Sequence, residues 1–157
     1  DWSSDVCSSD LIMSELKVER KENMCGGEGH ILIKHILGEK ELNGKCGLYA
    51  EVTIEPGCSL GYHEHHNESE TYYILRGEGD YNDNGVIRPV KAGDVTFTPD
   101  GKGHGMKNTG DTDLVFMALI IFDLLTAGNE IKKDSRSEKT GVDQKNFLIP
   151  WICCLFK

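Results

Sequence analysis

Apolar and polar residues alternate over several short segments of the chain, each bounded by turn residues. In residues 48–54, LYAEVTI, apolar side chains recur at every second position. A strand has this period because successive side chains point to opposite faces of its sheet. Aromatic and β-branched residues favour the same structure in residues 70–76, ETYYILR. The sequence therefore predicts strands at residues 30–37, 48–54, 70–76, 95–98 and 114–122, with further short strands leading to His63 and through His104.

Turn residues between these segments indicate how neighbouring strands connect. Asn84-Gly85 predicts a two-residue hairpin turn, because both residue types tolerate the positive φ angles that such a turn requires. Pro89 has no backbone N–H to donate, so the returning strand is expected at a sheet edge or at a bulge.

Residues 114–122, LVFMALIIF, are apolar at almost every position. A strand of this composition is expected to be covered on both faces. One face can pack inside the domain. For the other face the sequence leaves two candidates, a second subunit and the chain's own N-terminal arm.

The ends of the chain lack the alternating pattern. Residues 1–12, DWSSDVCSSDLI, precede a methionine that could begin a natural protein, and we expect them to be a non-native extension. Residues 13–28 are expected to form an N-terminal arm, either extended or helical over part of its length. Residues 124–157 have a polar middle, so we expect a disordered or aberrant tail there. The predicted domain is then 29–123.

The formal net charge of the chain is −9. Residues 13–123 hold 19 acidic and 11 basic residues, a net charge of −8, so the acidity belongs to the predicted domain. Nucleic acids and anionic membrane surfaces attract basic patches, and neither is an expected partner. No segment reaches the roughly 18 apolar residues of a membrane helix. The six cysteines form no CxxC pair and no secretory signal is visible, so a cytoplasmic protein with reduced thiols is expected.

Residues 57–108 contain four side chains that could bind a metal. His63 and His65 lie on one face of a strand, Glu70 follows a short loop, and His104 begins a later strand. Three neutral imidazoles and one carboxylate suit a divalent ion such as Mn, Fe, Co, Ni, Cu or Zn. On an octahedral ion, four protein ligands would leave two positions for water or substrate, unlike a closed structural zinc site. Glu68 is an alternative carboxylate.

The spacing of these residues resembles the two motifs of the cupins. The first motif is matched by Gly57, five residues, His63, one residue, His65, four residues, Glu70, six residues and Gly77. The second is matched by Gly93, five residues, Pro99, one residue, Gly101, two residues, His104, three residues and Asn108. Fifteen residues separate the motifs, as in small bacterial cupins. The resemblance covers about residues 29–123.

The resemblance implies an all-β fold, a small antiparallel β-barrel or jelly roll, with one metal ion on His63, His65, Glu70 and His104. Related cupins are often homodimers, which favours a second subunit on the strand at 114–122. Sugar-phosphate isomerases, oxalate decarboxylases and dioxygenases of the superfamily use this ligand set. The expected function is therefore to bind or transform a small carboxylate, sugar or enediol-type ligand on the metal.

Two other functions stay open at this point. The domain could bind or sense a small molecule or metal without turnover, or it could be an oligomeric scaffold with a vestigial metal site. If it is an enzyme, the candidate catalytic residues are Tyr72, on a ligand strand, and Glu51, on the strand at 48–54. By strand alternation, Tyr72, Ile74 and Met106 are expected to face the cavity, with Phe97 and Phe116 as its wall.

Overall fold

The structure, a computed structural model, describes residues 16–123. The predictions for residues 1–12 and 124–157 lie outside the described residues. Within the described part, the chain forms ten strands, one short α-helix and one 3-10 turn. In order these are β1 (Val18–Glu22), η2 (Met24–Gly26), β2 (His30–His35), α1 (Glu39–Leu42), β3 (Cys46–Ile54), β4 (Ser59–Glu64), β5 (Glu68–Arg76), β6 (Glu78–Asp83), β7 (Val86–Lys91), β8 (Val95–Thr98), β9 (Gly103–Asn108) and β10 (Leu114–Phe122).

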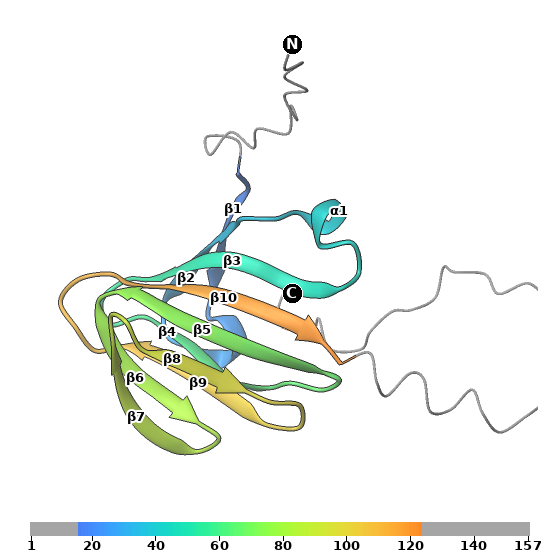
Figure 1. Cartoon of the computed structure of the whole chain (residues 1–157). Coiled ribbons are helices and arrows are strands. Elements are labelled where there is room, and N and C mark those ends of the chain that lie inside the picture. Colours follow the sequence, from blue (N-terminus) through green and yellow to red (C-terminus); the bar gives the residue numbers. More distant parts are fainter. Residues whose placement is uncertain (1–15, 124–157) are drawn as a thin grey trace, which may run out of the picture.

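The strands form two antiparallel sheets (Figure 1). The larger sheet has the order β1-β2-β3-β10-β5-β8, and the smaller has the order β4-β9-β6-β7. One hydrophobic core joins them, with Val52 and Phe116 from the larger sheet and Leu60 and Met106 from the smaller. The predicted all-β jelly-roll class is confirmed.

The hairpin predicted at Asn84-Gly85 joins β6 to β7. Asp83 pairs with Val86, and the two turn residues have φ angles of 48° and 95°. Such angles give the turn a twist that matches its strands. Strand β7 is the edge of the smaller sheet, where Pro89 leaves no ladder bond unmade.

The N-terminal arm is extended and belongs to the larger sheet. Strand β1 pairs with β2 from Val18 opposite Lys34 to Glu22 opposite His30. The sheet therefore starts before residue 29, and the helical alternative for this part of the arm is wrong. The Gly-rich segment that follows packs tightly, because a Cβ atom on Gly61 would overlap the carbonyl oxygen of Cys25.

Strand β4 contains a bulge that decides which side chains face inward. Leu60 pairs with Met106 and His63 pairs with His104, so two residues of β4 lie opposite one residue of β9. The extra residue shifts the alternation by one position. As a result, Leu60 packs in the core and His63 also faces inward.

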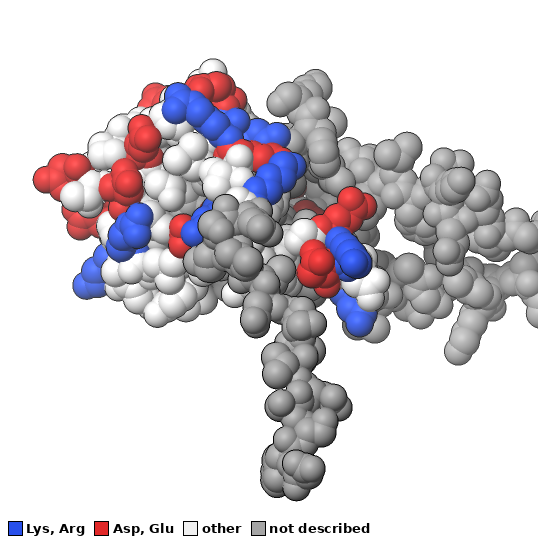
Figure 2. Space-filling view, turned by 90° about the horizontal axis from the view of Figure 1, so that it is seen from above, with Lys and Arg blue, Asp and Glu red and all other residues white. Residues whose placement is uncertain are grey.

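Strand β10 lies between β3 and β5, at the centre of the larger sheet. Its inner face is buried, but Met117 and Leu119 on the outer face are half-buried and Ile121 is exposed. Within the described residues, the N-terminal arm therefore does not cover the whole outer face. On the face seen in Figure 2, basic and acidic side chains are interspersed.

Candidate metal centre

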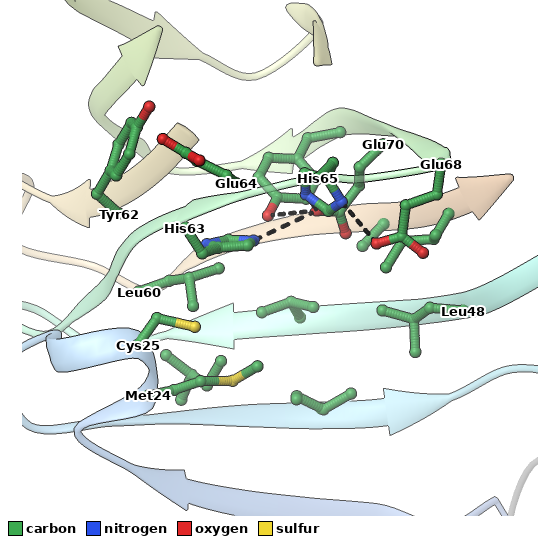
Figure 3. Close-up of a pocket in the computed structure, with 16 residues that line it drawn as sticks. Met24, Cys25, Leu48, Leu60, Tyr62, His63, Glu64, His65, Glu68 and Glu70 are labelled. Carbon is green, nitrogen blue, oxygen red and sulfur yellow. Dashed lines mark hydrogen bonds and ion pairs between the residues drawn. The ribbon is translucent and has the colours of Figure 1, made fainter. Parts of the chain in front are cut away.

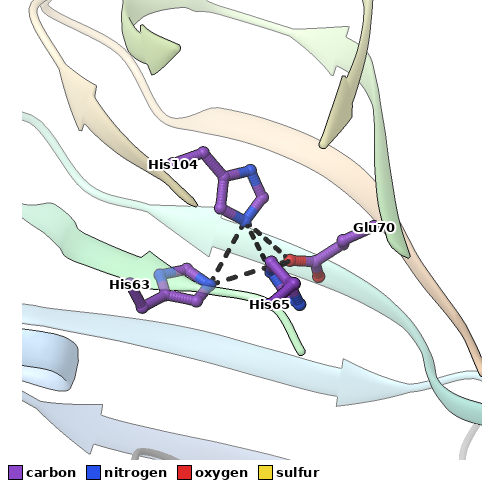
Figure 4. A group of neighbouring side chains, drawn as sticks. All are labelled: His63, His65, Glu70 and His104. Carbon is purple, nitrogen blue, oxygen red and sulfur yellow. Dashed lines mark hydrogen bonds and ion pairs between the residues drawn. The ribbon is translucent and has the colours of Figure 1, made fainter. Parts of the chain in front are cut away.

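Four side chains from three strands and one loop converge between the two sheets (Figure 4). His63 lies in β4, Glu70 in β5 and His104 in β9. His65 follows the end of β4, where its backbone N–H donates to the carbonyl of Lys102 over 2.9 Å. One ligand atom from each of the four residues lies within 4.8 Å of the others. The structure thus brings together the four residues singled out in the sequence.

The distances in this cluster suit a single metal ion. Nε2 of His104 lies 2.8 Å from Oε2 of Glu70, 3.0 Å from Nε2 of His65 and 3.2 Å from Nε2 of His63. Oε2 of Glu70 lies 3.1 Å from Nε2 of His65 and 3.8 Å from Nε2 of His63. Ligands bound about 2.1 Å from one ion at right angles are about 3.0 Å apart. The donor set and its spacing therefore fit a transition metal.

Burial shifts the ionisation of the cluster. The side chains of His65, Glu70 and His104 are at most 4% exposed, and that of His63 is 17% exposed. Burial raises the pKa of the Glu70 carboxyl, but hydrogen bonds from His104, His63 and His65 outweigh it and leave the pKa well below its usual value. Burial lowers the pKa of His104, and the nearby Glu70 only partly opposes this effect. An ionised carboxylate beside a neutral imidazole is what a metal ion requires.

His65 has two carboxylate neighbours. Burial lowers the pKa of its imidazole, but hydrogen bonds to Glu68 and Glu70 outweigh that effect and raise the pKa to about 9. Metal binding at Nε2 of His65 therefore has to displace a proton near neutral pH.

A second layer of side chains and one backbone carbonyl hold the rings. Oε1 of Glu68 lies 2.9 Å from Nδ1 of His65, and the carbonyl of Gly61 lies 3.1 Å from Nδ1 of His63. Around Nδ1 of His104 are the hydroxyl oxygens of Thr98, at 2.8 Å, and Tyr81, at 3.1 Å. Partners of this kind fix the ring so that its other nitrogen faces the metal.

Sequence reasoning missed Thr98 and Tyr81. Thr98 pairs with Glu70 in the larger sheet. Tyr81 lies in β6 of the smaller sheet, and its hydroxyl reaches Thr98 in the larger sheet. Neither position is marked by the spacing of the histidines. Their role becomes visible only once the strand register is known.

The two candidate catalytic residues have different surroundings. The hydroxyl of Tyr72 donates to Oε2 of Glu70 over 3.1 Å and lies 3.2 Å from Nε2 of His104. Burial raises the pKa of Tyr72 well above its usual value, and the adjacent Glu70 adds to this effect, so the hydroxyl stays protonated. The expectation for Glu51 is corrected, because its carboxylate lies on the outer face of β3, 3.9 Å from Nζ of Lys34.

The expected cavity wall is also wrong. Ile74, Met106 and Phe116 are buried in the core but are not among the described residues that line the cavity, and Phe97 is 60% exposed. In β8 the inward position at this level is that of Thr98, and the strand alternation turns the Phe97 ring outward. His66 is not part of the cluster and pairs with Glu64 over 3.5 Å.

The cluster opens into a cavity of about 470 Å³ (Figure 3). Its polar side carries His63, His65 and Glu70, together with Glu68. Most of the remaining lining comes from the larger sheet, η2 and β4. These residues are Met24, Cys25, Ile31, Ile33, Leu48, Val52, Leu60, Tyr62, Glu64, Tyr72, Ala118 and Ile120.

Comparison with known proteins agrees with this architecture. Residues 50–122 match the Cupin domain family. A protein of Thermotoga maritima named oxalate-binding protein is 48% identical over 108 residues, which cover 69% of this chain and 89% of the relative. This chain is a cupin. The matched region includes both motifs and all four residues of the cluster.

Two further comparisons place this cupin among its relatives. A crystal structure of a Thermotoga maritima protein, described as a predicted oxalate decarboxylase, has 47% identity and a TM-score of 0.68. The match covers 71% of this cupin and 96% of that chain. An oxalate decarboxylase of Bacillus subtilis is 36% identical over 75 residues, but these are only 20% of its length. In the described part of this cupin, no helix is long and apolar enough to cross a membrane.

Proposed function

We propose that this cupin holds one divalent transition metal on His63, His65, Glu70 and His104 and binds a small carboxylate ligand beside it. The observation that carries the proposal is a four-donor cluster, mostly buried, that opens into a cavity. The name of the Thermotoga maritima relative, an oxalate-binding protein, supports a carboxylate as ligand. Binding without turnover is the alternative to catalysis on the bound ligand.

The residues in and around the cluster would have different roles. Nε2 of each histidine and the carboxylate of Glu70 would hold the metal, which when bound supplies a Lewis acid for carboxylate oxygens. Tyr72 offers a protonated hydroxyl next to these donors, so it can donate a hydrogen bond to Glu70 or to a ligand. Tyr72 is therefore the candidate for a residue that touches the ligand.

Elemental analysis of the purified protein tests the metal site. We expect about one Mn, Fe, Ni, Cu or Zn per chain in the parent protein and a loss of most of it in His104→Ala. His66→Ala is the matched control, because His66 pairs with Glu64 outside the cluster. Equal metal content in the parent and His104→Ala would overturn the ligand assignment.

Calorimetric titration of the metal-loaded protein with oxalate tests the ligand class. We expect binding that disappears when a chelator removes the metal. Incubation followed by quantification of the remaining oxalate then separates binding from turnover. If oxalate and other small carboxylates give no heat and do not raise the melting temperature, the carboxylate proposal fails.

The outer face of the larger sheet supports a homodimer as part of the proposal. Register places Val95, Tyr73 and Met117 in one row, next to a row with Phe97, Thr71 and Leu119. Val95 is 64% and Phe97 60% exposed. An apolar patch of this kind is typical of a protein interface.

Sedimentation measurements check the homodimer. We expect a dimer for the parent protein and a monomer for Phe97→Asp. Ile87→Asp is the control, because Ile87 is similarly exposed but lies on β7 in the other sheet. A parent protein that sediments as a monomer at all concentrations would contradict the proposed interface.

A cytoplasmic location also remains a proposal. Cys46 and Cys58 are free thiols. Free thiols are typical of proteins kept in a reducing compartment. Fractionation of cells that make the protein would check this location.

A further inference from the structure

The cavity has a polar end and an apolar end. Figure 3 shows His63, His65 and Glu70 on one side, with Leu48, Leu60 and Met24 on the other. The apolar side is formed mainly by β2, β3 and β10 of the larger sheet. Its aliphatic residues there are Ile31, Ile33, Leu48, Val52, Ala118 and Ile120.

The charges around the cavity limit the charge of its ligand. Among the described residues, those lining the cavity include Glu64, Glu68 and Glu70 but no Lys or Arg. At the cluster itself, a divalent ion and its ligand Glu70 together carry one net positive charge, and Glu64 and Glu68 add only negative charge to the lining. One negative charge on a ligand is enough to balance the ion and Glu70. A dianion such as oxalate leaves one negative charge without a cationic partner, which is costly away from water.

The size of the cavity also favours a ligand larger than oxalate. A volume of about 470 Å³ lies within the range of about 300–1,000 Å³ found for pockets that enclose drug-sized ligands. Oxalate consists of two joined carboxylates and would occupy only the end next to the cluster. The aliphatic wall beyond it would gain nothing from oxalate, whereas it favours an apolar substituent.

We propose that the preferred ligand is a 2-oxo or 2-hydroxy acid with one negative charge and an aliphatic substituent. Its carboxylate and neighbouring oxygen would lie at the polar end, as the oxygens of oxalate would. Its substituent would lie against Ile33, Val52 and the other aliphatic residues of the wall. This inference rests on the proposed metal-dependent carboxylate site and names the ligand class of that site.

A homologous ligand series tests the inference on the metal-loaded, full-length protein. The probes are oxalate, pyruvate, 2-oxobutanoate, 2-oxopentanoate and 2-oxohexanoate, each titrated by calorimetry. We expect the dissociation constant to fall about fourfold with each added methylene, as expected for complete burial of that group. We also expect 2-oxohexanoate to bind more tightly than oxalate.

The outcomes separate this inference from the function on which it rests. If oxalate binds most tightly and chain length has no effect, the inference is overturned and the carboxylate site stands. If the protein holds no metal, or if no carboxylate binds, both are overturned. If affinity rises with chain length and 2-oxohexanoate binds more tightly than oxalate, the result supports both the carboxylate site and the preference for an aliphatic substituent.

A charge placed on the wall provides a second test. Leu48 lines the aliphatic side of the cavity and is 7% exposed, so a lysine there places a charge on the wall that is proposed to hold the substituent. In Leu48→Lys we expect oxalate to gain about tenfold over 2-oxohexanoate, because the charged side chain removes part of the apolar contact of the substituent, which oxalate does not use. Thr53→Lys is the matched control, since it adds the same charge to the outer face of β3.

The control variant should keep the preferences of the parent protein. If both lysine variants change the preference equally, the effect comes from net charge and the location of the substituent is wrong. If Leu48→Lys does not fold, the ligand series with the parent protein still tests whether the substituent lies against the aliphatic wall.

Discussion

Glu68 orients His65. Its carboxylate oxygen Oε1 lies 2.9 Å from Nδ1, and Nε2 of the same ring lies 3.1 Å from Glu70 and 3.0 Å from His104. From the sequence, Glu68 is an alternative to Glu70 as the carboxylate ligand of the metal. The structure gives the two carboxylates different positions, one behind the histidine ring and one inside the cluster.

Replacing Glu68 by alanine should weaken metal binding without abolishing it. Loss of such an orienting partner typically lowers metal affinity by about 10- to 100-fold. Competition with a chromogenic chelator measures the change. Glu64→Ala is the control, because it removes the same charge from a side chain outside the cluster. Equal affinities for the two variants would mean that Glu68 acts only through its charge.

The metal-free protein should lose stability as the pH rises through about 9. The pKa of His65 is raised to about 9 in the folded state and is close to 6.5 in the unfolded chain. A group of this kind stabilises the fold fully below pH 6.5, and the contribution fades as the pH passes the folded-state pKa. The loss can reach about 3 kcal/mol.

Urea unfolding with a chelator present, from pH 6 to 10, measures this loss. The metal-loaded protein should not show it, because the metal replaces the proton on Nε2. The apparent metal affinity should rise over the same range. A metal-free protein that is equally stable at pH 6 and pH 10 would rule out a charged His65.

Tyr72→Phe should retain the metal and lower the stability of the metal-free protein. The variant removes the hydroxyl that donates to Oε2 of Glu70. A hydrogen bond to a charged group contributes about 1.5–3 kcal/mol, and unfolding in urea measures the difference. Titration with oxalate then shows whether Tyr72 also contacts the ligand. A loss of metal in this variant would mean that Tyr72 is needed to form the cluster itself.

Gly61→Ala should destabilise the domain. A Cβ atom at this position overlaps backbone atoms of η2, which cannot move as a flexible side chain would. Overpacking of this kind typically costs about 1–3 kcal/mol. Gly110→Ala is the control, because the nearest atom is the flexible Cγ of Glu78 at 3.2 Å. Thermal unfolding of the two variants provides the comparison.

The sequence predicted the strands, the hairpin and the residues of the cluster because each leaves a local signal. The dipeptide Asn84-Gly85 predicts the hairpin turn, and the two motifs give the spacing of the histidines. The role of Thr98 could not be predicted, because it depends on the register between β5 and β8. The same register turns Phe97 to the outer face, against the prediction from the sequence.

The bulge in β4 shows a second limit. Strict alternation from Leu60 would turn His63 outward, and only the extra residue opposite β9 brings both inward. Nothing in the sequence marks this residue as additional. The sequence also leaves the segment 18–22 open between a helix and an extended arm, because its strand is formed by pairing with β2.

The two ends of the cavity are built from different parts of the fold. All three histidines come from β4, β9 and the loop after β4, whereas the aliphatic wall comes from β2, β3 and β10. Substitutions in the wall can therefore accumulate over generations without changing a residue of the cluster. A lineage with this architecture can change the molecules it recognises while it inherits the same four-residue cluster.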